Sequence, residues 1–404
     1  MRDESKNNQI VPSRKRNLIT RSQGMARRGL ELSAKIGKRI EIERDVRHLK
    51  TFKLHSGWVD PLRVSSDGKY VVSGSGDCTI CKWEISSGEV LCRLQESLSV
   101  HDVDISPDSH YAISACMDID GDEDGYSVEQ VAVSLWDLES GRKVRTFQEF
   151  SPPDDTGYSG NPQPGNSRVI LSPDVRYAIF RDEESLSLWN VVTGRKEITW
   201  REPAMLYDPS ILRYSPDGKY VIAALGMRII LFESNQPVSF INMPMWIEDV
   251  NFAQDENHIN CTGAYYNYDP SGEKFESWSA RLYKFNINEM ENINIINDRS
   301  RCFRHLTKPY KSQIFREKIS EMILSHDGRY TIIITEESRE EKIQPNQYGG
   351  RWHYYMHVYD SSDGWNQVFS QEIEYPTSLS ISPDNRIALV GNRDGSVDIY
   401  SLPN

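Results

Sequence analysis

Residues 55–94 read HSGWVDPLRVSSDGKYVVSGSGDCTICKWEISSGEVLCRL, and this stretch decides the fold. Two short alternating segments, 62–65 and 70–75, flank a tight turn made of Ser, Asp, Gly and Lys. Two more strand-like segments follow at 79–85 and 90–94, joined by a second turn. Short strands linked by tight turns pair with their neighbours, so the stretch predicts a four-stranded antiparallel meander.

The first turn of this unit recurs along the chain with a Ser-Pro-Asp or Ser-Xaa-Asp signature. After the copy at Ser65, further copies start at Ser106, Ser172, Ser215, Ser325 and Ser382, and a divergent copy starts at Ala253. An aromatic residue ends the third strand of every unit in the same phase: Trp83, Trp136, Trp189, Phe232, Phe285, Tyr359 and Tyr400. Such a sheet cannot bury both faces alone and needs stacked neighbours. Seven four-stranded units at a spacing of roughly 40 residues predict an all-β fold, a seven-bladed β-propeller.

The first unit also resembles a known family. Its residues His55, Ser73, Asp77 and Trp83 match the buried, hydrogen-bonded tetrad of WD-repeat β-propellers. The resemblance covers about residues 49–404 and implies that this tetrad braces the first blade. Later units keep only parts of the motif, and the sequence reveals no second complete tetrad.

The two parts of the chain differ in charge. Residues 1–53 hold 15 Lys+Arg against 6 Asp+Glu, whereas the whole chain has a net charge of −12. Residues 1–45 are predicted to be a basic N-terminal extension, loosely ordered or helical, and residues 46–404 to be the propeller. The last blade has only three strands of its own. Residues 49–54 are therefore predicted to pair with Val397–Tyr400 and close the ring.

Composition predicts a cytoplasmic, monomeric propeller that needs no cofactor. The chain has no apolar run long enough to span a membrane, and its first residues lack the apolar stretch of a signal peptide. Six cysteines show no disulfide-scaffold spacing, which is typical of reduced thiols. Cys78 and Cys81 are three residues apart on a predicted strand. They would face opposite sides of the sheet, so this pair does not predict a metal site.

The lengths of the connections distinguish the two faces of the disc. Turns between the first and second strands are short, as are most turns between the third and fourth. The long insertions are interpreted as joining strands two and three or one blade to the next; they are 118–129, 151–166, 264–278, 290–318 and 336–352. Because successive strands of a blade run in opposite directions, the connections between strands two and three and those between blades lie on the same face, the long-loop or top face.

These insertions and their flanks are rich in aromatic residues and contain one basic cluster. The candidate partner-binding residues are Tyr126, Tyr158, Tyr265, Tyr266, Tyr268, Trp278, Arg301, Arg304, Trp352 and Tyr354. Aromatic and Arg side chains on a rigid scaffold are typical of protein-recognition hot spots. The alternative is that the aromatic residues pack their own loops.

The sequence therefore predicts a non-enzymatic scaffold that binds protein partners through its long-loop face. The basic cluster could meet phosphate, but its acidic neighbours and the net negative charge argue against nucleic-acid binding, except through the basic extension. No nucleophile elbow, phosphate-binding Gly-rich loop or paired-His zinc motif is present. The alternative function is a hydrolase or lyase with a site in the central channel, which would require a metal or a set of His, Asp and Glu side chains at the axis.

One insertion has the composition of a calcium loop. Asp120, Asp122 and Asp124 alternate with other residues, and Gly121 and Gly125 permit sharp turns. No bidentate Glu stands at the closing position, so calcium binding is expected to be weak, about 10⁻⁴–10⁻³ M. The alternative is an acidic surface hairpin without a metal.

Overall fold

The structure is a computed structural model, and every regular element in its described part is a β-strand. The described residues are 46–122, 125–150, 168–182, 185–200, 211–233, 236–243, 245–253, 257–268, 275–287, 311–315, 318–344, 347–360 and 366–403. The predicted basic extension, residues 1–45, lies outside this part. Residues 46–402 form one compact unit. No helix in these ranges is long and apolar enough to cross a membrane.

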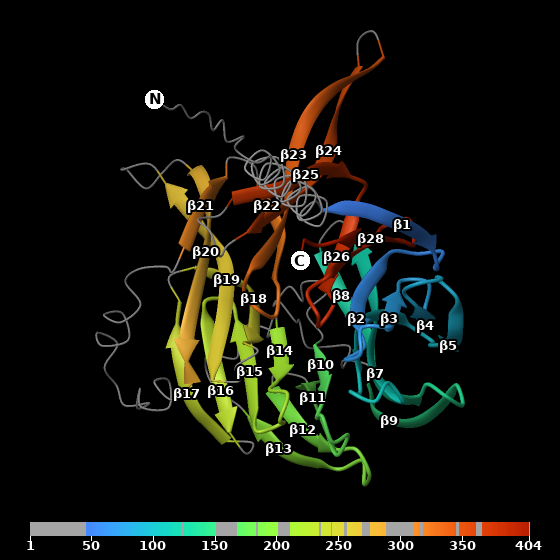
Figure 1. The fold of residues 1–404 in the computed structure, drawn as a ribbon. Helices are drawn as coiled ribbons and strands as arrows, with labels where there is room; N and C mark the ends of the chain where they lie inside the picture. The colour runs from blue at the N-terminus through green and yellow to red at the C-terminus, as the bar shows by residue number, and fades with distance from the viewer. Residues whose placement is uncertain are drawn as a thin grey trace, which may run out of the picture. The chain divides into compact units, whose positions relative to one another are not determined.

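Seven four-stranded antiparallel sheets make up this unit, and each is one blade (Figure 1). In six blades the strands follow sequence order from the inside outward, whereas the seventh has β26, β27 and β28 followed by β1. Blade one contains β2 (Val59–Val64), β3 (Tyr70–Ser75), β4 (Thr79–Glu84) and β5 (Val90–Gln95). Blade two contains β6 (Ser99–Ile105), β7 (Tyr111–Asp122), β8 (Gly125–Asp137) and β9 (Arg142–Phe150). Blade three contains β10 (Val169–Leu171), β11 (Tyr177–Asp182), β12 (Ser185–Asn190) and β13 (Lys196–Trp200).

The later blades repeat this order. Blade four contains β14 (Ile211–Tyr214), β15 (Tyr220–Leu225), β16 (Arg228–Glu233) and β17 (Gln236–Asn242). Blade five contains β18 (Trp246–Phe252), β19 (His258–Tyr268), β20 (Phe275–Asn286) and β21 (Lys311–Phe315). Blade six contains β22 (Lys318–Leu324), β23 (Tyr330–Gln344), β24 (Gln347–Asp360) and β25 (Asn366–Ile373). Blade seven contains β26 (Pro376–Ile381), β27 (Ile387–Asn392), β28 (Ser396–Ser401) and β1 (Arg47–Lys53).

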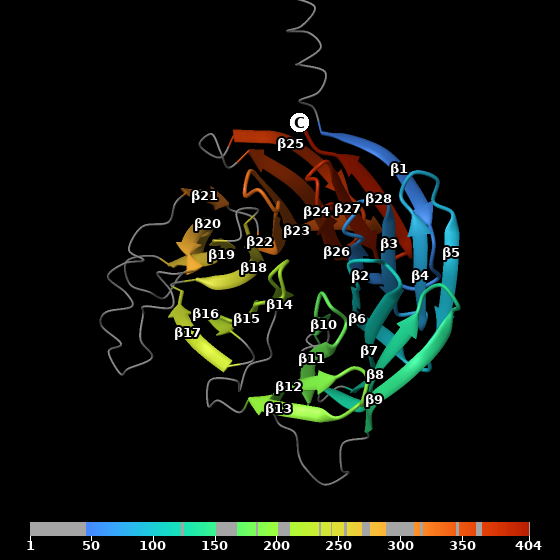
Figure 2. The ribbon, with the colours of Figure 1, turned by 60° about the horizontal axis from the view of Figure 1, so that its bottom comes forward.

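The innermost strands form a closed circuit around the axis. Each of β2, β6, β10, β14, β18, β22 and β26 contacts the next, and β26 contacts β2 again (Figure 2). Apolar side chains between consecutive blades form the core, as where Ile222 of blade four and Val250 of blade five lie in one buried cluster. The seven-bladed propeller predicted from the repeats is confirmed.

The recurring Ser-Xaa-Asp turn is held by its own side chains. The Ser65 hydroxyl donates a hydrogen bond to Asp67 (2.7 Å) and accepts one from the Tyr70 N–H (2.9 Å). The same pair of bonds recurs in the turns that begin at Ser106, Ser172, Ser215, Ser325 and Ser382. The fourth residue of each turn has φ between 58° and 74°. Gly adopts this conformation readily, whereas the β-branched Val175 occupies it at a cost in backbone strain.

At the axis, side chains of one blade satisfy the open edge of the next. The Asp102 carboxylate accepts a hydrogen bond from the Val169 N–H (2.9 Å), and Asp249 accepts one from the Leu324 N–H (3.0 Å). Glu321 likewise accepts one from the Leu379 N–H (3.1 Å). An innermost strand has backbone groups that no neighbouring strand can pair, so these bonds remove the cost of leaving them unsatisfied.

The N-terminal strand completes the last blade. β1 pairs antiparallel with β28, with Phe52 opposite Val397 and Lys53 opposite Ser396. The Phe52 ring packs edge-on against Trp83 of blade one at 5.9 Å between centroids. This pairing is the one predicted for residues 49–54.

Two expectations about the long insertions need revision. Residues 118–129, 264–278 and 336–352 contain strand extensions rather than loops, because β7–β8, β19–β20 and β23–β24 continue their ladders into these segments. The placement of 290–318 on the top face is wrong. It joins the third and fourth strands of blade five, β20 and β21, and this connection leaves the blade at the opposite, bottom face.

We expect deletion of residues 1–44 to leave the propeller folded and deletion of residues 1–54 to open blade seven. Only the second truncation removes β1 and the packing of Phe52 on Trp83. Thermal unfolding followed by circular dichroism, together with size-exclusion chromatography, distinguishes the two proteins. Equal melting temperatures for both truncations would show that β1 does not close the ring.

Candidate functional site

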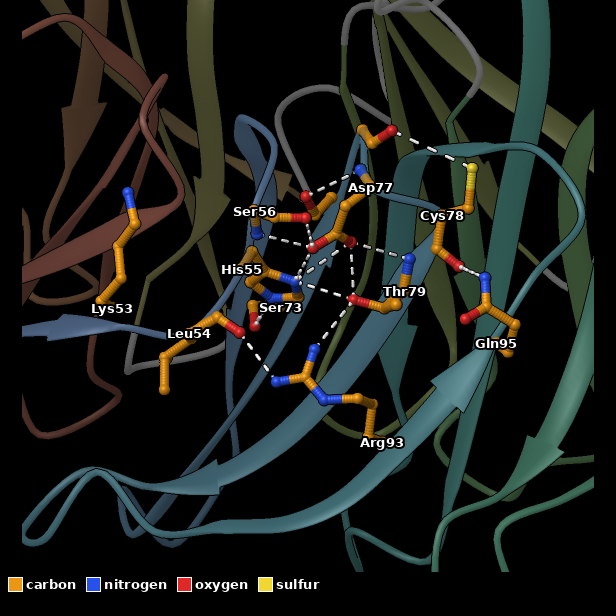
Figure 3. Close-up of polar contacts among 12 residues, drawn as sticks. Lys53, Leu54, His55, Ser56, Ser73, Asp77, Cys78, Thr79, Arg93 and Gln95 are labelled. Carbon is orange, nitrogen blue, oxygen red and sulfur yellow. Dashed lines mark hydrogen bonds and ion pairs between the residues drawn. The ribbon is translucent and has the colours of Figure 1, made fainter.

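The tetrad that the sequence singled out in blade one is a hydrogen-bond network, and Figure 3 shows His55, Ser73 and Asp77 of it. His55 Nε2 lies 2.8 Å from the Ser73 hydroxyl, which also accepts a hydrogen bond from Trp83 Nε1 (3.2 Å). His55 Nδ1 lies 3.4 Å from Asp77 and 2.9 Å from the Thr79 hydroxyl. Thr79 thus joins the four residues singled out from the sequence, and its hydroxyl donates to Asp77 (2.6 Å).

The protonation states in this network follow from its environment. Burial lowers the pKa of His55, and the neighbouring Asp77 opposes this only in part. Burial alone would raise the pKa of Asp77, but hydrogen bonds from the Thr79 hydroxyl and the Ser56 N–H outweigh it and bring the pKa to about 2. At neutral pH, Asp77 is therefore ionised and His55 is neutral.

This Ser-His-Asp arrangement has the connectivity of a hydrolase triad but not its accessibility. Ser73 is completely buried and His55 nearly so. A catalytic hydroxyl must reach a substrate carbonyl, whereas Ser73 is packed beneath Trp83 and bonded to it. The network is consequently structural.

Blade two contains a related network that the sequence motif did not reveal. The buried Glu96 carboxylate accepts hydrogen bonds from the Ser114 hydroxyl (2.7 Å) and from Trp136 Nε1 (2.8 Å), and Lys143 pairs with it at 2.8 Å. Glu96 lies 18 residues before Ser114, the same separation as His55 from Ser73. This separation of 18 residues could have revealed the second network from the sequence, but the motif was not recognised because Glu96 stands where the first blade has His55.

The axis of the propeller is lined by charged side chains rather than by apolar ones alone. Arg63 pairs with Asp102 at 2.8 Å, and Arg168 approaches the same carboxylate at 3.6 Å. Arg213 lies 3.8 Å from Asp249. The innermost strands also carry Asp60, Glu248 and Glu321, which are partly exposed.

These last three carboxyl groups are hard to ionise. Burial raises the pKa of Asp60 to about 6 and that of Glu248 to about 7. Burial, together with the nearby charges of Asp60 and Glu248, raises the pKa of Glu321 to about 8. Perturbed carboxyl groups that gather in one place are candidates for a functional site.

Few of the candidate partner-binding side chains can be placed. Trp352 and Tyr354 lie on β24 of blade six, where Trp352 is 46% exposed and Tyr354 contacts the ring of Tyr375 at 5.0 Å. Tyr126, Tyr265, Tyr266, Tyr268 and Trp278 belong to described strands, but their side chains lie outside the description. Tyr158, Arg301 and Arg304 lie outside the described residues altogether.

The candidate calcium ligands occupy a hairpin. Asp120 is opposite Ser127 and Asp122 is opposite Gly125 in the ladder of β7 and β8, while Asp124 lies outside the described residues. Among the side chains that the structure describes, no group of three or more His, Cys, Asp or Glu is arranged to hold a metal. Calcium binding by this hairpin stays a prediction.

Comparisons with known proteins agree with the fold. The family model "WD domain, G-beta repeat" matches residues 46–84, which contain β1 and the first three strands of blade one, β2 to β4. A crystal structure of the Cps50 (Swd1) β-propeller domain of Myceliophteria thermophila superimposes with a TM-score of 0.59 at 14% identity, covering 88% of this chain and 99% of that one. This likeness concerns the fold alone.

Two curated relatives are similar over parts of their length. The chain is 30% identical over 86 residues to the small ribosomal subunit protein RACK1y of rice, covering 21% of this chain and 22% of that protein. It is 22% identical over 241 residues to the mouse serine-threonine kinase receptor-associated protein, covering 57% of this chain and 61% of that protein. The similarity thus spans less than two thirds of either relative.

We expect Trp83→Ala to lower the free energy of unfolding by about 3–5 kcal/mol, because a buried indole leaves a cavity that the surrounding blades cannot fill. Trp83→Phe retains most of the volume but loses the hydrogen bond to Ser73, so its cost should be smaller. Guanidinium unfolding measures both. Equal losses for the two variants would contradict the importance of packing at this position.

We expect Glu321→Gln to stabilise the protein increasingly as the pH rises from about 5 to 8. The folded-state pKa of Glu321 lies above its unfolded value, so the ionisation cost is absent below the unfolded pKa and grows up to the folded pKa of about 8. Gln keeps an acceptor for the Leu379 N–H. The gain should reach about 1–3 kcal/mol at pH 8.

Denaturant unfolding at pH 5 and pH 8 checks this expectation. Glu89→Gln, at an exposed turn of blade one, is the matched control and should change little at either pH. A Glu321→Gln effect that is destabilising, or the same at both pH values, would contradict the burial of this charge.

Proposed function

We propose that this seven-bladed WD-repeat propeller is a non-enzymatic scaffold that binds protein partners through its top face. The top face is the end of the blades where strand two joins strand three and where one blade leads to the next. Its most informative feature is the hairpin of blade six. β23 and β24 remain paired from Tyr330–Asp360 out to Gln344–Gln347, far beyond the reach of the flanking strands (Figure 1).

The flanking pairings define how much of this hairpin stands alone. β22 pairs with β23 only as far as Glu336, and β25 pairs with β24 only from Tyr354. Residues 337–344 and 347–353 are therefore a two-stranded ribbon that no other described strand flanks. Such ribbons are marginally stable in water. A ribbon with free edges and an exposed Trp352 is suited to a partner that covers it.

Two other blades extend in the same way. In blade two the ladder of β7 and β8 continues past Met117–Val131, and in blade five that of β19 and β20 continues past Ala264–Ala280. All three hairpins join strands two and three, so antiparallel order brings them to the same face. The turns at the bottom face are by contrast short, as at residues 138–141, except for the long connection between β20 and β21 of blade five.

The relatives support a role in protein association, and the thiols support a reducing compartment. The names of the two relatives describe proteins that associate with other proteins, one with a ribosomal subunit and one with a kinase receptor. Cys78, Cys81, Cys92, Cys116 and Cys261 form no disulfide bond, which fits a reducing compartment and hence action in the cytoplasm.

The alternative is a hydrolase or lyase in the central channel. The raised pKa values of Asp60, Glu248 and Glu321 favour it, since such groups can act as general acids. However, none of these three carboxylates accepts a hydrogen bond from a Ser, Thr, Cys or Lys side chain of the described residues. An acid without a nucleophile or a metal beside it is a weaker basis for catalysis than the hairpins are for binding.

We expect removal of the blade-six ribbon to abolish partner binding without unfolding the propeller. Replacing residues 337–353 by Asn-Gly joins Glu336 to Tyr354, which already face one another, through a two-residue hairpin turn. Affinity capture from cell extract, quantified by mass spectrometry, compares this variant with the wild type.

The control for this experiment lies away from the top face. Leu91→Glu alters an exposed residue of the outermost strand of blade one and should leave the captured proteins unchanged. If the ribbon variant folds normally and captures the same proteins in the same amounts, the top face is not the interaction surface.

A further inference from the structure

The turns of blades three and four enclose a cleft of about 420 Å³ at the bottom face, opposite the long hairpins. Its two rims are residues 172–174, between β10 and β11, and residues 217–219, between β14 and β15. The rims contact each other at one point, since a Cβ added at Gly218 would lie 3.3 Å from Pro173 Cδ. Ligand sites typically have volumes of about 300–1,000 Å³, so this inter-blade cleft is large enough for a long side chain.

The floor of the inter-blade cleft is aromatic. Val221 and Phe232 are buried in the apolar cluster that blades three and four share. Tyr177 and Tyr214 pack against this cluster but remain partly exposed. Neither tyrosine hydroxyl forms a hydrogen bond with another described residue. Two tyrosine side chains that line the cleft are thus available to a ligand.

Other blades cover the equivalent tyrosine with a basic side chain of their own. The charged group lies over the ring at 5.2 Å from the centroid for Lys82 and Tyr70, at 4.3 Å for Lys219 and Tyr220, and at 4.8 Å for Arg329 and Tyr330. Tyr177 and Tyr111 hold this position in blades three and two, and no Lys or Arg within the described ranges lies over either ring. A cation is attracted to the face of a tyrosine ring, so the uncovered Tyr177 favours a cationic ligand in the cleft.

The rim of the cleft carries a carboxylate oxygen without a partner. Asp217 Oδ1 serves its own turn, where it accepts hydrogen bonds from the Ser215 hydroxyl (2.5 Å) and the Lys219 N–H (2.9 Å). In three other turns Oδ2 pairs with the basic side chain two residues on, at 3.3 Å for Asp67, 3.6 Å for Asp174 and 3.9 Å for Asp384. Lys219 pairs with Glu233 (2.9 Å) instead, so Asp217 Oδ2 has no ion-pair partner among the residues that the structure describes.

The basic side chains nearest the cleft are already paired. The Lys219 ammonium, besides its pairing with Glu233, donates to the Tyr220 hydroxyl. Tyr220 belongs to the cluster that blade four shares with blade five, so this ammonium group is directed away from blade three. Arg176 pairs with Asp174 and does not line the cleft. The lining residues therefore leave a cation to be supplied from outside.

The protonation states define what kind of cation fits. The hydrogen bond from Ser215 lowers the pKa of Asp217, which is therefore ionised at neutral pH. Burial, together with the nearby charge of Asp174, raises the pKa of Tyr214, so its hydroxyl stays protonated and can accept a hydrogen bond. A guanidinium group stacks on an aromatic ring and donates several N–H bonds in its plane, whereas an ammonium group is a point charge. An ionised carboxylate, a neutral hydroxyl and an open ring together favour a guanidinium.

We propose that the inter-blade cleft binds an arginine side chain of a partner protein. The guanidinium stacks on Tyr177 and donates hydrogen bonds to Asp217 Oδ2 and the Tyr214 hydroxyl. Its aliphatic stem packs on the apolar floor. The cleft lies on the face opposite the hairpins, so it gives the propeller a second binding site that is independent of the top face.

Parallel selections of a phage-displayed library of random dodecapeptides test the proposal. The immobilised full-length proteins are the wild type, Asp217→Asn and Asp384→Asn. Asn keeps the Oδ1 acceptor of each turn and replaces Oδ2 with an amide donor. We expect a group of peptides enriched on the wild type and on Asp384→Asn but not on Asp217→Asn, and these peptides should share one Arg. The proposal is overturned if no peptide depends on Asp217, or if the dependent peptides share Lys or no basic residue.

Fluorescence anisotropy with one synthetic peptide of this group locates the guanidinium. Changing the peptide's Arg to Gln should weaken binding about tenfold or more, and changing it to Lys about threefold. Tyr177→Leu should weaken binding about fivefold because the stacked ring is lost, and Tyr214→Phe about threefold because an acceptor is lost. Tyr111→Leu, at the equivalent position of blade two, should leave the affinity unchanged. Equal affinity of the wild type and Tyr177→Leu would overturn the cleft as the site.

Two further measurements separate this site from folding and from the top face. Tyr177 and Tyr111 are both partly buried, so their Leu variants should show similar melting temperatures, and only the first should lose affinity. The variant that lacks the ribbon of blade six should bind the peptide as the wild type does. Weaker binding by the ribbon variant would place the peptide at the top face and overturn the proposal.

Discussion

The propeller depends on how the open edge of each innermost strand is satisfied. Seven strands converge on the axis, and each has backbone groups on one side that no strand can pair. Backbone N–H groups of one blade donate hydrogen bonds to carboxylates of another at this edge: Val169 to Asp102, Leu324 to Asp249 and Leu379 to Glu321. Apolar packing between blades has no direction of its own, whereas these bonds fix the height of one blade relative to its neighbour.

The same requirement explains why the axis is charged. A carboxylate that accepts a hydrogen bond from the backbone N–H of an innermost strand must lie near the centre of the ring, close to the carboxylates of other blades. Arg63, Arg168 and Arg213 compensate for part of this charge. Asp60 and Glu248 accept no hydrogen bond from a described backbone N–H group, so pairing of the open strand edges does not explain why these two carboxylates lie at the axis.

Sequence alone could predict the features that repeat. The bottom turn depends on local hydrogen bonds within six residues, as in Ser65 to Tyr70, so its signature survives in the sequence and sets the number of blades. The role of Glu96 was not predicted, because a Glu replaces the family's His and only its distance from Ser114 is retained. The prediction that residues 290–318 lie on the top face was wrong because no turn motif precedes β21 in the sequence. The sequence therefore gave no sign that β21 is the fourth strand of blade five. The carboxyl groups of Asp60, Glu248 and Glu321 come from three different blades, and only the closed ring brings them together.

The pairing of β1 with β28 also determines when the protein can finish folding. Arg47 and Ser401 are 354 residues apart in sequence yet share a hydrogen bond. Blades one to six can form from contiguous chain as synthesis proceeds, but blade seven must wait until residue 401 has left the ribosome. Until then β1 has no partner strand, so the nascent chain exposes the unpaired edge of β1. The final step of folding is therefore the pairing of β1 with β28, which is slow because closing so long a loop costs conformational entropy. Before it is complete, the unpaired strand edge can pair with another chain.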